Sequence, residues 1–301
     1  MARKKIKYRT KRKLNAFLYT LPWIIGFILF FAVPIVNTII YSFSSVGVKD
    51  TGGMILAPTG VTNYISLFTE QVTAAGSRTF AQLFTDENVN LFINAPIIVI
   101  FSLFLAILAN MNFKGRGFVR VIFFLPIVLG LDVITEMITV STGGDLVALR
   151  GTGIFSQGIA ARMLLKYTSI DADIILTVTD FVDNIFNLMS QAGVQTLIYL
   201  AGLQSISPSL YEVAKIEGAT TYETFWKVTL PMIGNISVFV IVYTIVEIFL
   251  SSPIAEEVYA FAFQKSNIGV GSALSVVYML NVLLILLLIL LISRKAVKSN
   301  G

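Results

Sequence analysis

Apolar segments long enough to cross a lipid bilayer constrain this sequence more than any other feature. A transmembrane α-helix needs about 20 mainly apolar residues, and segments of about that length recur along the 301-residue chain. Charged residues make up only 13% of the chain, against about 25% in soluble domains. We therefore expect an all-α, polytopic membrane protein with six spans, at residues 16–43, 89–111, 119–140, 184–203, 232–250 and 272–292.

The placement of basic residues predicts how these spans are oriented. Residues 1–15 form a basic N-terminal segment, with eight lysines and arginines between positions 3 and 13. Such a run can bind nucleic acid, but its position before a span is typical of a cytoplasmic anchor that also attracts anionic lipid. Basic residues recur at 114–120 and at 294–298. We expect both termini in the cytoplasm, a membrane-lipid partner and no nucleic-acid partner.

The segments between the spans divide into external and cytoplasmic pieces. Residues 44–88 and 251–270 are predicted to be external loops, the first because it is polar and rich in glycine. Residues 141–182 are placed outside as well, with one or two helices on the membrane surface, because the apolar run 174–178 is too short to cross. Residues 16–301 then form one transmembrane domain.

A polar segment at residues 207–231, which we call the elbow, lies on the cytoplasmic side between the fourth and fifth spans. Ser207 is a favourable N-cap and Pro208 suits the first helical position, so a short helix is expected to begin there. Gly218 should end it, because glycine enters the left-handed conformation without penalty. Thr220 with Glu223 three residues on is a capping-box pattern, which predicts a second short helix.

The elbow resembles the signature loop of the permease subunits of ATP-binding-cassette (ABC) importers. That signature reads Glu-Ala-Ala, three residues, Gly-Ala, and then Phe, Ile and Leu-Pro at fixed offsets. The residues that match are Glu212, Ala214, Gly218, Ala219, Phe225, Leu230 and Pro231. Val213, Glu217 and Val228 depart from the family pattern but keep the size class or charge of the usual residue.

The resemblance implies a type I ABC importer permease fold in a bacterial or archaeal cytoplasmic membrane. Residues 114–117 ahead of residues 123–126, together with residues 203–206, are similar to the sugar-importing subfamily. The implied substrate is a carbohydrate such as an oligosaccharide. The implied partners are ABC ATPase subunits, a second homologous permease and an extracytoplasmic solute-binding protein. ATP and Mg would be held by the ATPase.

In such importers the elbow is the coupling helix, which docks on the ATPase. The coupling residues implied by the resemblance are Tyr211, Glu212, Ala214, Glu217, Gly218, Ala219, Phe225, Leu230 and Pro231. Ala214 and Gly218 are the expected points of closest contact, because small residues allow close approach. Phe225 and Leu230 are expected to pack against the bundle of this chain. An ordinary interfacial helix-turn-helix, in which these residues serve only the fold, is the alternative.

The sequence lacks the residues on which most catalytic sites depend. It contains no histidine and no cysteine, which removes the commonest general base and the thiolate metal ligands. It also contains no Gly-x-x-x-x-Gly-Lys-Ser/Thr loop that would hold phosphates. We expect no catalytic residue, no metal and no bound cofactor in this chain, and ATP hydrolysis on a separate subunit.

Polar residues inside the predicted spans are the candidates for a substrate pathway: Glu136, Asn187, Gln191, Tyr243 and Glu247. Charged groups within a membrane are costly, so they face a cavity or a partner. Amides, carboxylates and aromatic rings suit a polyhydroxyl ligand, but the same residues can join helices to one another. The alternative functions are a secondary transporter or channel for a small polar solute, which would show inverted repeats, and a membrane-embedded enzyme.

Overall fold

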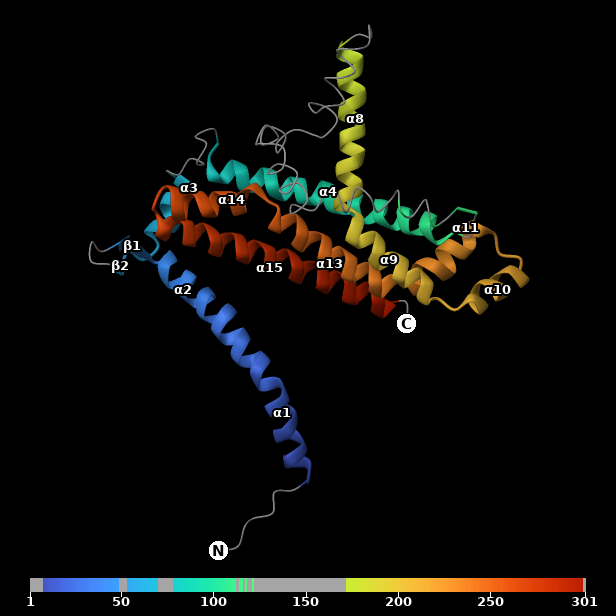
Figure 1. The fold of residues 1–301 in the computed structure, drawn as a ribbon, viewed down its shortest axis with the longest axis horizontal. Coiled ribbons are helices and arrows are strands. Elements are labelled where there is room, and N and C mark those ends of the chain that lie inside the picture. Colours follow the sequence, from blue (N-terminus) through green and yellow to red (C-terminus); the bar gives the residue numbers. More distant parts are fainter. Residues whose placement is uncertain are drawn as a thin grey trace, which may run out of the picture. The chain divides into compact units, whose positions relative to one another are not determined.

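The computed structural model describes residues 8–48, 53–69, 78–111, 114–115, 117, 121 and 172–299, which are mostly helical (Figure 1). The chain divides into two compact units. The first comprises Met1–Val89 and Phe249–Ile285, and the second comprises Asn90–Ile248 and Leu286–Gly301. Three long helices pass from one unit into the other.

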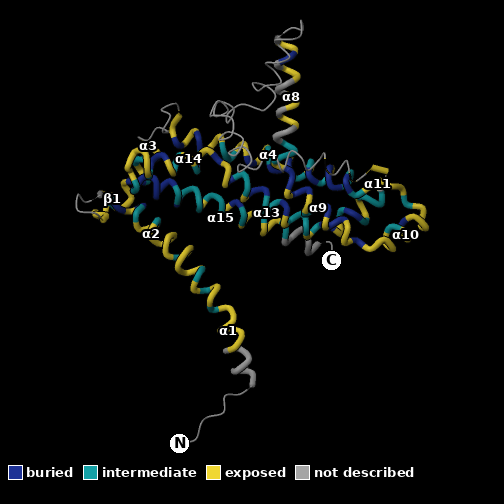
Figure 2. Tube along the Cα trace, viewed as in Figure 1, coloured by how far each residue is buried: buried dark blue, intermediate teal, exposed yellow. Residues whose placement is uncertain are grey.

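The first predicted span is a helix of three pieces, α1 (Tyr8–Phe27), η1 (Ile28–Ala32) and α2 (Val33–Ser42). The middle piece is a π-turn in which the N–H of Val33 bonds to the carbonyl of Ile28. The turn lies directly before Pro34, whose ring clashes with the carbonyl four residues back in a regular α-helix. A proline inside a helix commonly kinks it, and here the structure has a widened turn. No residue in the most apolar window of this helix is buried (Figure 2).

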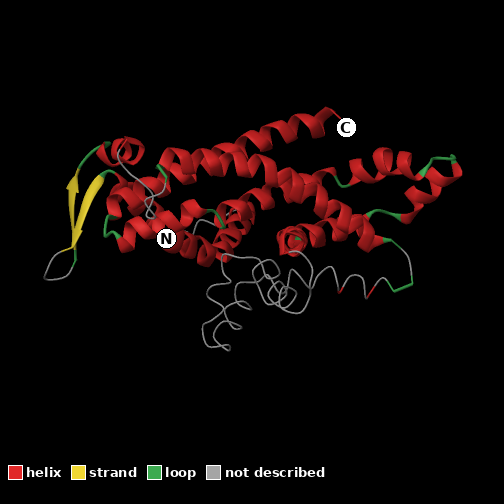
Figure 3. Ribbon diagram, turned by 90° about the horizontal axis from the view of Figure 1, so that it is seen from above, coloured by secondary structure: helices red, strands yellow, loops and turns green. Residues whose placement is uncertain are grey.

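Residues 44–69 are not the loop that the sequence predicts. They form an antiparallel ribbon of β1 (Ser44–Val48) and β2 (Met54–Pro58), followed by the short helix α3 (Thr62–Thr69) (Figure 3). The register pairs Val46 with Leu56 and Gly47 with Ile55. The ribbon is the one departure from an all-α fold among the described residues.

The second predicted span lies within α4 (Phe80–Asn110), which begins nine residues earlier than predicted. The early turns are helical because they pack: Phe80 and Leu83 are buried in the core of the first unit. The side chains that share this core are Leu67, Ile254, Phe261, Val270 and Leu274. Residues 80–88 therefore belong to a helix and not to an external loop.

The predicted external loop at 251–270 is also mostly helical. It holds α14 (Pro253–Tyr259) and the π-turn η4 (Ala260–Gln264), and the last helix, α15 (Ile268–Ser299), begins within it. Ser252 caps α14, because its hydroxyl oxygen accepts the N–H of Ile254. The prediction failed because the burial of Ile254 and Phe261 comes from contacts with distant parts of the chain.

In the second unit, the predicted span 184–203 is divided between two helices, α8 (Ala172–Gln191) and α9 (Gly193–Ser205). Helix α8 extends well into the segment that the sequence places outside. Helix α9 packs with α4 and with α13 (Gly234–Leu250) around a core of Ala106, Ala109, Tyr199, Leu200, Leu203, Ile206, Ile233 and Val240. A Cβ added to Gly202 would lie 2.5 Å from the Cδ1 atom of Ile236, so the small residue permits this close approach.

Among the described residues, three helices are long and apolar enough to cross a membrane: Asn15–Ser42, Phe80–Asn110 and Ile268–Ser293. A fourth candidate is the bent pair Thr221–Met232 and Gly234–Leu250. Predicted span 119–140 lies outside the described residues except for Val121, as does most of 141–182. Multiple spans make this a multi-pass membrane protein.

Candidate functional site

The elbow begins as the sequence predicts, with α10 (Pro208–Ile216). Ser207 occupies the N-cap position in an extended conformation, and Pro208 fills the first turn. The Ser207 side chain does not cap the helix, however. Its hydroxyl lies 2.7 Å from the hydroxyl of Ser209, while the Ser207 carbonyl accepts the N–H of Leu210.

Gly218 ends α10 in the left-handed conformation, with φ +78°. The N–H of Ala219 donates to the carbonyl of Ala214 at 2.9 Å, and the N–H of Gly218 donates to the carbonyl of Lys215 at 3.2 Å. A Cβ at position 218 would have no neighbour within 4 Å. The requirement for glycine is therefore conformational, and another residue would cost about 1–2 kcal/mol without any steric clash.

The second half of the elbow starts at the predicted capping box. Helix α11 (Thr221–Thr224) has Thr220 as its N-cap, with the Thr220 N–H donating to Glu223 at 3.0 Å and the Glu223 N–H to the Thr220 hydroxyl at 3.2 Å. The bond from the Thr220 N–H holds the pKa of the Glu223 carboxyl below its ordinary value, and Lys227 adds to this effect. The stability that the Glu223 carboxylate adds to the cap is therefore fully present above the ordinary carboxyl pKa and is lost as pH falls through the lowered value, while the bond from the Glu223 N–H to the Thr220 hydroxyl remains.

A π-turn and a sharp bend connect the elbow to α13. The π-turn η3 (Phe225–Thr229) is followed by α12 (Leu230–Met232), and the N–H of Leu230 bonds to the carbonyl of Phe225, one residue before Pro231. The axis then bends by 68° at Ile233, which is fully buried. Because the Ile233 N–H bonds to Thr229 and its carbonyl accepts the N–H of Ser237, the backbone passes into α13 without a flexible linker.

The two halves of the elbow are joined on their inner side. The hydroxyls of Tyr211 and Thr229 lie 3.3 Å apart, and Thr229 is buried. Tyr211 and Leu230 pack against the core of the second unit, which confirms the predicted packing role of Leu230. Ala214 is only 7% exposed. It lies inside the folded elbow, and not on the surface where the sequence analysis expects a contact.

The outer side of the elbow carries an apolar surface that the sequence analysis missed. We use the name aromatic face for four residues of the elbow that are each exposed: Val213, Ile216, Tyr222 and Trp226. Ile216 is 85% exposed and Tyr222 is 72% exposed. The rings of Tyr222 and Trp226 pack edge to face, with their centroids 6.1 Å apart. The available signal was the spacing of Tyr222 and Trp226, which lie four positions apart and so on one face of a helix.

The other coupling candidates lie around this surface. Glu212, Glu217 and Pro231 are exposed, whereas Ala219 and Phe225 are half-buried. The Phe225 ring packs edge to face on Trp226, with centroids 5.3 Å apart. The elbow thus combines a buried inner side with an outer side of aromatic, aliphatic and charged groups, a composition suited to binding another protein.

The substrate-pathway candidates are placed on different helices. Glu136 lies outside the described residues. Asn187 and Gln191 lie one turn apart on α8, where Gln191 is exposed. Tyr243 and Glu247 lie one turn apart on α13, and both are half-buried.

Glu247 has a partner that was not selected from the sequence. The Nε2 atom of Gln195, on α9, donates to the Glu247 carboxylate at 2.6 Å. Gln195 is fully buried, and its Oε1 atom has no hydrogen-bond partner among the described residues. The pair joins α9 to α13 and satisfies one acceptor of an intramembrane carboxylate. Sequence spacing could not reveal it, because the two residues are 52 positions apart.

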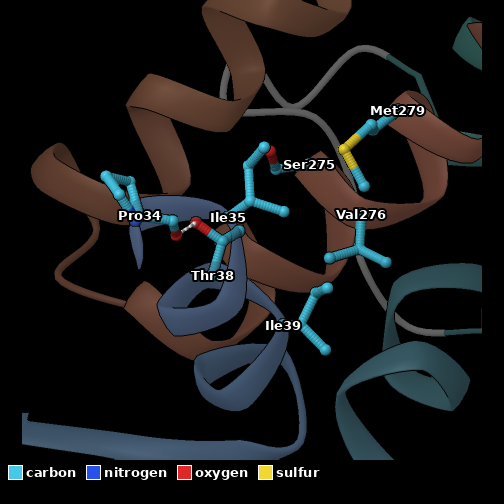
Figure 4. A pocket seen from close by; sticks show the side chains of 7 residues that line it. All are labelled: Pro34, Ile35, Thr38, Ile39, Ser275, Val276 and Met279. Atoms are coloured by element: carbon cyan, nitrogen blue, oxygen red, sulfur yellow. Dashed lines mark hydrogen bonds between the residues drawn. The ribbon is translucent and has the colours of Figure 1, made fainter. Parts of the chain in front are cut away.

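A small pocket lies in the first unit, between α2 and α15. Its volume is about 130 Å³, and its lining residues are Pro34, Ile35, Thr38, Ile39, Ser275, Val276 and Met279 (Figure 4). The Thr38 hydroxyl is turned to its own backbone, where it donates to the Pro34 carbonyl. Ligand sites usually measure about 300–1,000 Å³, so this pocket is too small for an oligosaccharide.

Known proteins with this arrangement are transport permeases. No family model matches the chain. It is 28% identical to the Probable ABC transporter permease protein YesP of Bacillus subtilis, over 83% of this chain and 75% of that protein. It is 24% identical to the arabinooligosaccharides transport system permease protein AraP of the same organism, over 96% of this chain and 90% of that protein. The lactose transport system permease protein LacF of Rhizobium radiobacter is 26% identical, over 82% and 76%.

The fold agrees with these relatives. A chain of the bacterial alginate ABC transporter, solved in complex with an alginate pentasaccharide-bound periplasmic protein, superposes with a TM-score of 0.66 at 19% identity, over 98% of this chain and 99% of that one. A second alginate transporter structure gives 0.64 at 20% identity. The sequence relatives confirm the resemblance inferred from the elbow. Over most of its length the chain is similar to permease proteins of ABC transporters, some of which are named for the sugars they transport.

Proposed function

We propose that this chain is the transmembrane subunit of an ATP-driven importer that moves an oligosaccharide delivered by an extracytoplasmic solute-binding protein. A separate ATPase would bind ATP and Mg, and a second permease would complete the pathway. The relatives are transport permeases whose names specify arabinooligosaccharides and lactose, which supports a carbohydrate substrate.

The observation that carries the proposal is the construction of the elbow. Its inner side is fixed to the core through Tyr211 and Leu230, while Ile216, Tyr222 and Trp226 project from its outer side. Exposed apolar patches outside the membrane mark interaction sites. We assign this surface to the ATPase.

The same construction explains how ATPase closure would move the permease. A force on the aromatic face acts on the elbow, whose two halves are held by the Thr220 capping box and by the contact between Tyr211 and Thr229. The hydrogen-bonded connection through Ile233 then delivers the displacement to α13. Coupling in this scheme requires rigidity on both sides of Gly218.

The substrate pathway is proposed to involve the polar residues of α8 and α13. Tyr243 and Glu247 would offer a ring and a carboxylate, and Asn187 and Gln191 would offer amides. Glu136 remains part of this proposal. Gln195 is added as a positioning residue, because its amide holds the Glu247 carboxylate.

The proposed topology is six spans with both termini in the cytoplasm. Because the chain has no native cysteine, single introduced cysteines report their side of the membrane without background. We expect Arg78→Cys and Ser266→Cys to react with an impermeant maleimide from outside intact cells, and Thr221→Cys to react only after permeabilisation. External labelling of Thr221→Cys would show that the elbow lies outside the cell, and it would exclude the elbow as an ATPase contact.

Reconstitution tests the function itself. The purified chain alone in vesicles should show no ATP hydrolysis. Together with its ATPase and second permease it should hydrolyse ATP, faster when the sugar-loaded binding protein is added. Sugar uptake driven by an ion gradient in vesicles that contain this chain alone would instead establish a secondary transporter.

A further inference from the structure

The strongest feature outside the elbow is an uncovered apolar surface beside the end of the first span. We call it the collar: β2 together with the outer face of α3. Met54, Ile55 and Leu56 on the strand and Val61, Ile65 and Phe68 on the helical segment are 45–58% exposed. Positions 61, 65 and 68 fall on one face of a helix, whereas Asn63 and Leu67 on the other side are buried.

We infer that the collar lies in the membrane interface, with its exposed side chains among lipid headgroups and the first part of the acyl chains. The occupant of this surface is thus lipid and not a protein. The inference does not depend on the proposed import function, since it follows from the first unit alone.

The length of the first span fixes the depth of the collar. The helix Asn15–Ser42 contains 28 residues, which gives about 42 Å at about 1.5 Å per residue. A bilayer measures about 40–45 Å including its headgroups. With the basic residues before Asn15 at one surface, Ser42 reaches the opposite headgroup layer and not beyond it. Any tilt would leave Ser42 deeper. The ribbon begins at Ser44, two residues later.

Hydrogen bonds hold the collar at this depth. The buried Asn63 amide donates to the carbonyls of Ser42 and Ser44, each at 3.0 Å. The Tyr64 hydroxyl lies 2.7 Å from the hydroxyl of Ser42, and the N–H of Thr59 donates to the carbonyl of Phe43 at 2.9 Å. The start of α3 is therefore tied directly to the last turn of α2, and the helix cannot swing out into water.

The charge pattern distinguishes a lipid surface from an aqueous one. Of the 26 residues from Ser44 to Thr69, only Lys49 and Asp50 are charged, and both belong to the connection between the strands. Soluble globular domains carry about 25% charged residues. Phe43 and Tyr64, whose ring centroids are 5.2 Å apart, add the aromatic residues that gather at membrane interfaces.

Cysteine reactivity in lipid vesicles tests the inference on the full chain. Ile55→Cys and Ile65→Cys are compared with Thr221→Cys in the elbow as the aqueous reference and with Phe30→Cys in the first span as the lipid reference. Removal from water raises the pKa of a thiol. Each pKa unit of that rise lowers the fraction present as reactive thiolate about tenfold. We expect both collar thiols to react with a membrane-permeant maleimide, which reaches both faces of the bilayer, at least tenfold more slowly than Thr221→Cys.

A second readout separates lipid from protein cover. Bimane attached at positions 55 and 65 should be quenched by lipids that carry a nitroxide near the headgroup, and less by lipids labelled deep in the chain. Reaction as fast as that of Thr221→Cys without quenching would overturn the inference. So would protection that arises only when the binding protein or a second permease is added.

Discussion

Replacing both Tyr222 and Trp226 by alanine is expected to abolish stable binding of the ATPase while leaving the permease folded. The two rings are 72% and 51% exposed, so their removal leaves no cavity in the core. Aromatic residues at the centre of an interface typically contribute about 2–4 kcal/mol each, and one such loss weakens binding roughly 30- to 1,000-fold. The measurement is the affinity of the ATPase for the permease in lipid nanodiscs.

The control for this experiment is Leu250→Ala, which removes an equally exposed apolar side chain at the opposite end of α13. It should leave ATPase affinity unchanged. The conservative variant Trp226→Phe should retain most of the affinity. If the double alanine variant binds the ATPase as tightly as the parent, the aromatic face is not the docking surface and the assignment of the elbow fails.

The second large effect is expected at Gly269, at the start of α15. A Cβ at this position would lie 2.5 Å from the carbonyl oxygen of Ser44 and 3.0 Å from Nδ2 of Asn63. The carbonyl belongs to the backbone and already accepts a hydrogen bond from the Asn63 amide. Moving it to make room for a methyl group would therefore cost free energy. We expect Gly269→Ala to destabilise the protein by roughly 1–3 kcal/mol, measured as a lower unfolding temperature in lipid nanodiscs.

Gly234→Ala is the matched control, because a Cβ there has no neighbour within 4 Å and α13 begins at this residue. It should be neutral or slightly stabilising, since alanine favours a helix over glycine by up to about 1 kcal/mol. Equal unfolding temperatures for the two variants would show that the start of α15 does not pack tightly against Ser44 and Asn63.

The sequence predicts local backbone features well where one residue determines the outcome. Gly218 has the positive φ expected of it, and Thr220 and Glu223 form both bonds of the capping box. Each of these depends on neighbours within a few positions. The π-turns before Pro34 and Pro231 have a local cause too, since both prolines disturb the preceding turn.

The predictions fail where contacts with residues far along the chain decide the structure. The segments at 44–88 and 251–270 lack a long apolar run, so they were predicted as loops, yet the core of the first unit draws residues from both. Ala214 matches a family motif, but the fold of the elbow buries it. Gln195 stands out from the sequence only as a polar residue in a span, and its bond to Glu247 depends on how α9 packs against α13.

The sequence by itself therefore determined that this is a multi-pass membrane protein, with an elbow that resembles the signature loop of ABC permeases. Apolar length and charge placement act through transfer to the bilayer, which each segment experiences separately. The tertiary structure alone decided which side of the elbow is exposed, which residue holds Glu247 and where the collar is fixed. These features depend on contacts between residues far apart in the chain, and no local pattern specifies which distant side chain will cover a given one.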